Sequence, residues 1–202
     1  LMLLSTLGVN VTPMLASVGV AGLALTLGAQ TLIRDIIGGV FILVENLYAV
    51  EDVIKVGTVS GSVERITLRS THIRDITGNL HMIPNGDVRV VSNLTRDWSQ
   101  ARVDIDLNDG ESFEHAHKAL ETLIMTFDHD PQMAPHLKGS PQIIGPTHLK
   151  GSVVTVHIVV KTEPGAQWDV SRMLQARVLT ACDRENIELQ SVAINVPGDA
   201  FA

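Results

Sequence analysis

The chain has 202 residues and a formal net charge of −7, from 15 Lys and Arg against 22 Asp and Glu, and it is long enough for one or two ordinary domains. The negative balance, with two Trp and one Tyr, argues against a nucleic-acid surface built from basic patches and stacking rings, so no nucleic acid is expected as a partner. The single cysteine, Cys182, excludes an internal disulfide and suits a reduced cytosolic interior.

Charge is absent from residues 1–33, and every Lys, Arg, Asp and Glu lies from Arg34 onward. A hydrocarbon core about 30 Å thick requires roughly 20 residues of helix, and the apolar run from Pro13 to Ile33, continued by Ile36 to Val44, is long enough. A secretory signal peptide would need a basic start, which this sequence lacks. We therefore predict a membrane helix, and we interpret residues 1–7 as the end of an earlier apolar span of a multi-pass protein.

Cations follow the apolar run closely, and a cation excess beside a membrane segment marks the cytoplasmic side. We therefore expect residues from about 51 onward to lie in the cytoplasm. The cations concerned are Arg34, Lys55, Arg65, Arg69 and Arg74.

A helical wheel, advanced about 100° per residue, organises the apolar run into one ridge with two flanks of small residues. Helices in lipid associate through such small residues, so one small stripe predicts a pair and two predict a ring of identical subunits. The ridge contains Val20, Leu23, Leu27 and Gln30; one flank contains Ser17, Ala21, Ala24 and Gly28; the other contains Gly19, Gly22, Thr26 and Ala29.

In a ring, the ridge points at the central axis, where Leu23 and Leu27 form an apolar constriction and Val20 and Gln30 line the pore. Narrow apolar rings can stop ion flow by dewetting, so the same leucines are candidates for a gate. The alternative is that the small residues pack a monomeric bundle, and the wheel alone leaves both arrangements open.

The second half of the run is interrupted by Arg34 and Asp35, and Gly38 and Gly39 are the expected place for a helix bend. A charged pair at a membrane boundary either lines a water-filled pore exit or acts as an interfacial anchor, and the two roles stay open here. We expect this half to leave the axis and lie near the interface.

The soluble part begins with short β-type runs that predict a small β-domain over residues 51–95. Turns are expected at Gly78-Asn79 and at Pro84-Asn85-Gly86. The expected strands are Val53 to Val56, Val63 to Leu68, Leu80 to Ile83 and Val88 to Val91.

Residues 96–202 give the order βαββαβ, which is the ferredoxin-like arrangement. Apolar residues alternate in the strands and recur at helical spacing between them. The expected strands are Arg102 to Leu107, Gln142 to His148, Ser152 to Lys161 and one containing Val192, Ile194 and Val196; the helix faces are Phe113, Ala116, Leu120, Leu123 and Phe127, and Val170, Leu174, Val178 and Ala181. The fold class is thus a membrane α-helical pore segment (1–50), a β-domain and an α+β ferredoxin-like domain in a ring-forming homo-oligomer.

Catalysis finds little support in the sequence. The eight histidines are scattered and are expected to be solvated, and zinc spacings, Gly-rich phosphate loops and nucleophile elbows do not occur. Asp104 and Asp106 share one face of a strand, and a solvated face is a better interpretation than a catalytic dyad. We expect no enzyme, no cofactor and no metal.

The chain resembles the family of small-conductance mechanosensitive ion channels from Val18 to Pro197, and several motifs carry this resemblance. They are Ala21-Gly22-Leu23-Ala24 with Leu27 and Gln30, then Gly39, then Glu51-Asp52-Val53-Ile54, then Gly61-Ser62-Val63-Glu64 with Ile66, Leu68-Arg69, Thr71 and Ile73-Arg74, and Ile83-Pro84-Asn85-Gly86.

The resemblance implies a channel of usually seven subunits in the bacterial inner membrane, opened by bilayer tension and releasing ions and small solutes on hypo-osmotic shock. Its partners would be copies of itself, membrane lipids and the permeating solutes. It also implies a two-part pore helix whose leucine rings correspond to Leu23 and Leu27, a β-domain collar, and a hollow vestibule with side openings. Family members have a glycine hinge where this chain has Thr31, so the hinge is expected at Thr31 or nearer Gly38 and Gly39. The rival hypothesis is a membrane-anchored oligomeric sensor that binds a small ligand.

Overall fold

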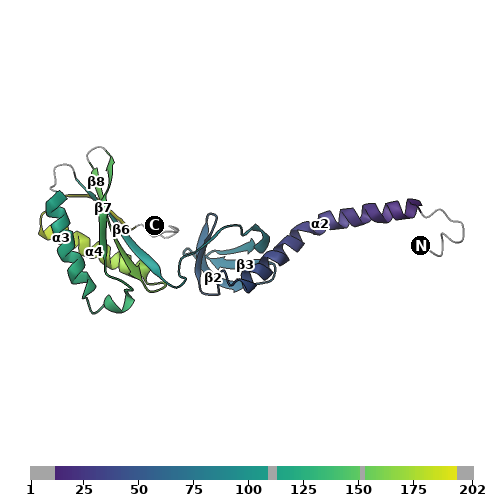
Figure 1. The fold of residues 1–202 in the computed structure, drawn as a ribbon, viewed down its shortest axis with the longest axis horizontal. Coiled ribbons are helices and arrows are strands. Elements are labelled where there is room, and N and C mark those ends of the chain that lie inside the picture. The colour runs from purple at the N-terminus through teal and green to yellow at the C-terminus, as the bar shows by residue number, and fades with distance from the viewer. Residues whose placement is uncertain (1–11, 109–112, 151–152, 195–202) are drawn as a thin grey trace.

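The computed structural model describes residues 12–108, 113–150 and 153–194, and Figure 1 shows three parts in chain order: a long helix, a β-sheet domain and a domain with two helices. The expectations for residues 1–7 and for Val196 lie outside the described residues.

Helix α2 (Thr12–Val44) projects away from both sheets as one unbroken, gently curved helix (Figure 1). Among the described helices it alone is long and apolar enough to cross a membrane, over Met14–Val44 with a mean hydropathy of 1.6. A core helix of a soluble protein can pass the same test, but only 17% of the apolar window is buried here. The low burial favours a membrane helix.

The C-terminal end of α2 is closed by backbone hydrogen bonds in a Schellman-type arrangement. The amide of Leu47 donates to the carbonyl of Ile42 at 3.2 Å, and the amide of Glu45 donates to Phe41 at 2.9 Å. Asn46, with φ of 49°, occupies the left-handed position that such an ending requires. Ile42 is buried and Leu47 packs in the same cluster, so the helix end is anchored in the β-domain.

The β-domain is a five-stranded antiparallel sheet in the order β4-β3-β2-β1-β5. Its buried core contains Ile54, Val63 and Ile73 from the sheet together with Ile42 of α2 and Tyr48, which follows the helix. The elements are β1 (Val53–Val56), β2 (Val59–Ile66), β3 (Ser70–Arg74), β4 (Leu80–Pro84), the 3₁₀ turn η1 (Asn85–Asp87) and β5 (Val91–Asn93).

Both expected turns of the β-domain are confirmed, but two strand predictions are wrong. The run expected over Val63 to Leu68 belongs to β2, which ends at Ile66, and the separate strand β3 was not predicted. The last strand begins at Val91, because η1 occupies Asn85–Asp87 and Val88 caps it.

The second domain has the predicted βαββαβ order, and its four strands form the antiparallel sheet β7-β8-β6-β9. Both helices contribute to the single core on one face of this sheet (Figure 1). The elements are β6 (Ser99–Leu107), α3 (Phe113–Asp128), the 3₁₀ turn η2 (Ala134–His136), β7 (Gln142–Lys150), β8 (Val153–Thr162), α4 (Gln167–Arg184) and β9 (Leu189–Ile194). The ferredoxin-like prediction is confirmed.

Candidate functional site

The apolar ridge of α2 is exposed in the single subunit. Leu23 and Leu27 are 67% and 71% exposed, and Val20 is 67% exposed. Removing such side chains from water is worth roughly 1.5–3 kcal/mol each, so this surface requires lipid or other copies of the helix around it. Leu25, which the wheel places opposite the ridge, is also exposed, so the helix is exposed on both of these sides within the single subunit.

The two small-residue flanks of α2 are open as well. A shallow groove on one flank is lined by Ala16, Ser17, Val20, Ala21 and Ala24. A methyl group added at Gly19, Gly22 or Gly28 would meet no atom of the subunit within 4 Å outside the helix's own nearby backbone. No contact within the described subunit therefore explains these glycines. The helix–helix packing of both flanks remains a prediction; it concerns Ser17, Gly19, Ala21, Gly22, Ala24, Thr26, Gly28 and Ala29.

The two glycines near the end of α2 lie against the β-domain instead. A Cβ added at Gly38 would lie 2.7 Å from the carbonyl oxygen of Asn85, and one at Gly39 would lie 2.1 Å from the carbonyl oxygen of Leu68. Glycine is therefore required here for close approach of two backbones. Since α2 is continuous through both residues, their role as a hinge, and that of Thr31, stays a prediction.

The junction between α2 and η1 includes a charged residue. Asp35 is buried, and its Oδ1 accepts a hydrogen bond of 3.2 Å from the amide of Gly86. Its Oδ2 lies 3.8 Å from a guanidinium nitrogen of Arg69. Asp35 thus contacts the β-domain, and the exposed Arg34 beside it has its side-chain carbons close to Gly86 as well. A role for this pair at the pore exit remains a prediction, and the contact with Gly86 was not predicted.

Beneath this junction, Asn85 is held by a buried chain of hydrogen bonds. The hydroxyl of Thr71 donates to Asn85 Oδ1 at 2.9 Å, and the Asn85 amide group donates to the carbonyl of Thr67 at 2.9 Å. The hydroxyls of Tyr48 and Thr71 lie 2.9 Å apart. Burial raises the pKa of Tyr48, although its bond with Thr71 acts in the opposite direction. The network fixes the turn on which α2 rests, because a buried polar group without a partner is costly.

The histidines and carboxylates form no metal site in the part of the chain that the structure describes, where no group of three or more His, Cys, Asp or Glu could hold an ion. The expectation of solvated histidines is wrong for His72, which is buried beside Arg65 and Ser70. Asp104 lies on the uncovered sheet face as expected, but it is bonded to Arg102 and to His157, each at 2.7 Å.

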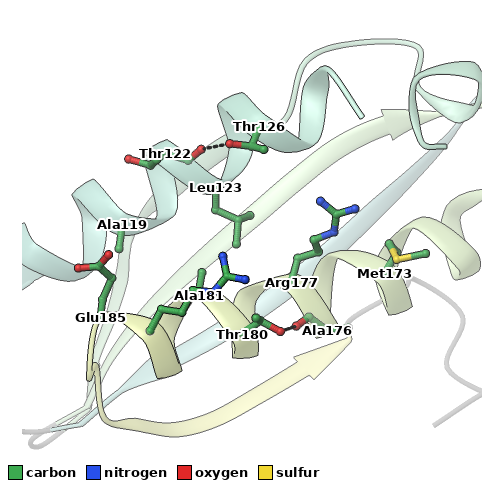
Figure 2. A pocket seen from close by; sticks show the side chains of 11 residues that line it. Ala119, Thr122, Leu123, Thr126, Met173, Ala176, Arg177, Thr180, Ala181 and Glu185 are labelled. Atoms are coloured by element: carbon green, nitrogen blue, oxygen red, sulfur yellow. Dashed lines mark hydrogen bonds between the residues drawn. The ribbon is translucent and has the colours of Figure 1, made fainter. Parts of the chain in front are cut away.

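A groove of about 500 Å³ lies between α3 and α4, and it is the feature that a ligand-binding hypothesis would use (Figure 2). The threonine hydroxyls that line it donate to carbonyls of their own helices, from Thr126 to Thr122 and from Thr180 to Ala176, each at 2.9 Å. Arg177 is bonded to Asp130. These side chains are therefore engaged within the domain, which leaves Arg184 and Glu185 as the other charged groups of the groove.

Family models match almost the whole chain in three consecutive segments. Residues 1–30 match the transmembrane helices 2/3 of mechanosensitive ion channels, residues 31–96 match their β-domain, and residues 101–189 match the C-terminal region of the MscS type.

Curated relatives agree with these matches. The chain is 34% identical over 185 residues to a small-conductance mechanosensitive channel of Caldanaerobacter subterraneus, covering 92% of this chain and 64% of the relative. It is 33% identical over 178 residues to the moderate conductance mechanosensitive channel YbiO of Escherichia coli, covering 88% of this chain and 24% of the relative. The chain thus spans less than two thirds of the length of these relatives.

Solved structures share the fold. The closed-state structure of Helicobacter pylori MscS matches with a TM-score of 0.77 and 23% identity, covering 96% of this chain and 76% of that chain. The structure of Arabidopsis thaliana MSL1 matches with a TM-score of 0.70 and 18% identity, covering 93% of this chain and 69% of that chain.

Proposed function

Because the chain belongs to the MscS-like family of mechanosensitive ion channels, we propose that it supplies the pore-lining helix and cytoplasmic domains of a channel opened by membrane tension. The observation that carries the proposal is α2: its leucine ridge is exposed between two flanks of small residues, and a methyl group added at the flank glycines Gly19, Gly22 and Gly28 would have open space around it. Such a helix is suited to a ring in which each copy packs against two neighbours.

In this proposal the ring contains seven subunits in a bacterial inner membrane, the protein crosses the membrane more than once, and residues from about 51 onward lie in the cytoplasm. The ring surrounds a pore that releases ions and small solutes on hypo-osmotic shock. Leu23 and Leu27 close the pore by excluding water from a narrow apolar segment. The contacts of Gly38, Gly39 and Asp35 with the β-domain would carry movement between the pore helix and the collar.

The relatives named above are channels rather than enzymes, and the proposal requires no catalytic group or cofactor. The rival, a membrane-anchored sensor, would need a recognition site in the ferredoxin-like domain. The groove between α3 and α4 is the strongest candidate, and its side chains Thr126, Thr180 and Arg177 are already bonded within the domain.

The gate is tested by Leu23→Ser and Leu27→Ser in patch recordings of the complete protein. A hydroxyl at either ring should hydrate the constriction, so each variant should open at lower tension than the wild type. Leu25→Ser, placed by the wheel on the opposite side of α2, is the matched control and should leave the opening tension nearly unchanged. Equal thresholds in all four proteins would exclude these leucines as the gate.

A further inference from the structure

The segment Leu94–Trp98 joins the two cytoplasmic domains, and its first residues are bonded to the β-domain. The amide of Leu94 donates to the carbonyl of Val53 at 2.8 Å. The amide of Val53 in turn donates to the hydroxyl of Thr95 at 3.0 Å. These paired bonds extend the β1–β5 ladder into the segment, so its start cannot move without strand β1.

The same segment is also bonded to the ferredoxin-like domain. The carbonyl of Leu94 accepts bonds from the hydroxyl of Ser99 at 2.7 Å and from the side-chain amide of Gln167 at 3.1 Å. Gln167 begins α4 and is 1% exposed. The ammonium group of Lys138 donates to the carbonyl of Asp97 at 2.8 Å. Bonds on both sides hold Asp97 in the left-handed region, with φ of 61°, which a non-glycine residue rarely adopts.

The side chain of Arg96 connects this segment to α2. Its Nη1 atom donates to the carbonyl of Asn46 and, at 3.1 Å, to the carbonyl of Leu47. Both carbonyls belong to the turn that ends α2, and the last turn of α2 contains no basic residue. A cation beside a helix C-terminus is favourable, because the last carbonyls carry partial negative charge. Arg96 therefore supplies, from 50 residues away in sequence, the cation that the helix end lacks.

We infer that Leu94–Trp98 is a strap that couples the ferredoxin-like domain to the end of α2, with Arg96 as the positioning residue, and this inference rests on the proposed channel function. The strap runs in series: Gln167 holds Leu94, and Arg96, two residues later, holds Asn46 and Leu47. A displacement of α4 therefore changes the position of the α2 end, and movement of α2 under tension pulls on α4. Loss of either anchor weakens the connection between the helix end and the ferredoxin-like domain, because only the bonds of Ser99 and Lys138 then hold the strap on that side or because Arg96 no longer holds the helix end.

The strap is tested in the complete protein with Arg96→Gln, Gln167→Leu and the double variant. Released helix ends move with less restraint, so both single variants should open at lower tension than the wild type. Because the anchors act in series, the double variant should shift the threshold no further than the larger single shift. Arg96→Lys keeps a cationic donor, so it should lower the opening threshold less than Arg96→Gln does. Arg89→Gln, at an exposed arginine of the same β-domain, should leave the threshold unchanged.

Amide hydrogen exchange of the same proteins measures how firmly the α2 end is held, and it does not require a channel current. Exchange at the amides of Glu45 and Leu47 should rise several-fold in Arg96→Gln, and also in Gln167→Leu, although Gln167 does not contact the α2 end. Protection unchanged in Gln167→Leu, or threshold shifts that simply add in the double variant, would overturn the coupling. If the wild type gives no current while both variants show the increased exchange, the proposed channel function is contradicted and the coupling through the strap is retained.

Discussion

Gly39 shows how a single residue sets the distance between α2 and the β-domain. In Gly39→Ala the new Cβ would lie 2.1 Å from the carbonyl of Leu68, so the helix or the β-domain must shift. Overpacking of this kind costs typically 1–3 kcal/mol, partly offset by the better helix propensity of alanine, roughly 0.5–1 kcal/mol.

We therefore expect Gly39→Ala to lower the thermal unfolding midpoint of the detergent-solubilised protein by about 2–8 °C. The matched control is Gly139→Ala, where the nearest atom to an added Cβ is 3.7 Å away, an ordinary contact. Equal midpoints for the two variants would show that α2 does not pack on Leu68 in this way.

Asp75 gives a prediction about pH. Its carboxylate accepts bonds from His81 at 2.9 Å, from the hydroxyl of Thr77 at 2.7 Å, and from the backbone amide of Asn79 at 2.8 Å. These bonds, that of His81 foremost, hold the pKa of Asp75 well below its ordinary value of 3.8. A carboxyl whose pKa is depressed on folding stabilises the protein above the ordinary pKa, and that stability is lost as the pH falls below it.

The wild type should therefore lose thermal stability below about pH 4. The unfolding midpoint of Asp75→Asn should be lower than that of the wild type at neutral pH, and it should decrease less steeply as the pH falls. Asp87→Asn, at an exposed carboxylate of η1, controls for the loss of one charge. Parallel pH profiles for Asp75→Asn and the wild type would contradict a depressed pKa at this hairpin.

At the scale of the element, α2 divides into an exposed first half and a second half that packs on the β-domain. Gly22 lies in the first half, where an added Cβ would meet no atom within 4 Å outside the helix's own nearby backbone. Gly22→Leu should therefore leave the fold of the subunit intact, yet it should keep neighbouring helices apart in a ring.

The expected result is loss of the tension-opened current with unchanged circular dichroism and unchanged unfolding of the β-domain and the ferredoxin-like domain. Val18→Leu, which enlarges a residue that the wheel places opposite the leucine ridge, should conduct normally. If Gly22→Leu conducts as well as Val18→Leu, the small flanks do not form a packed pore, and a simple membrane tether becomes the better account.

Elements whose burial follows a simple period could be predicted from the sequence. Strand β6 alternates buried Val103 and Ile105 with outward Asp104, and α3 repeats apolar residues at helical spacing. Strand β3 was not predicted because its buried residues include Thr71 and His72, which are polar residue types typical of a surface. Their burial depends on hydrogen-bond partners far away in sequence, and local periodicity carries no information about such partners.

The same reason separates the predictable part of the candidate site from the rest. The ridge and flanks of α2 follow from helical spacing alone, within one segment. The contact of Asp35 with Gly86 and that of Arg96 with Asn46 join residues about 50 positions apart. The motif Pro84-Asn85-Gly86 predicted a turn, but its use as the support for α2 became visible only in the folded chain.

At the scale of the whole molecule, an apolar helix leads through a β-domain into a ferredoxin-like domain, and the helix end is bonded to the first and, through Leu94–Trp98, to the second (Figure 1). This continuity is what a tension-gated channel with a cytoplasmic regulator of its pore helix would require. A sensor that used α2 only as a tether would have no need of buried contacts at Gly38, Gly39 and Asp35.

The most direct test of the account is patch-clamp recording of the complete protein in plain lipid under stepped suction, without added ligand or other protein. We predict discrete currents that appear at a defined tension and vanish when suction is released. A protein that forms rings in the same membranes but stays silent up to patch rupture would contradict the tension-gated pore.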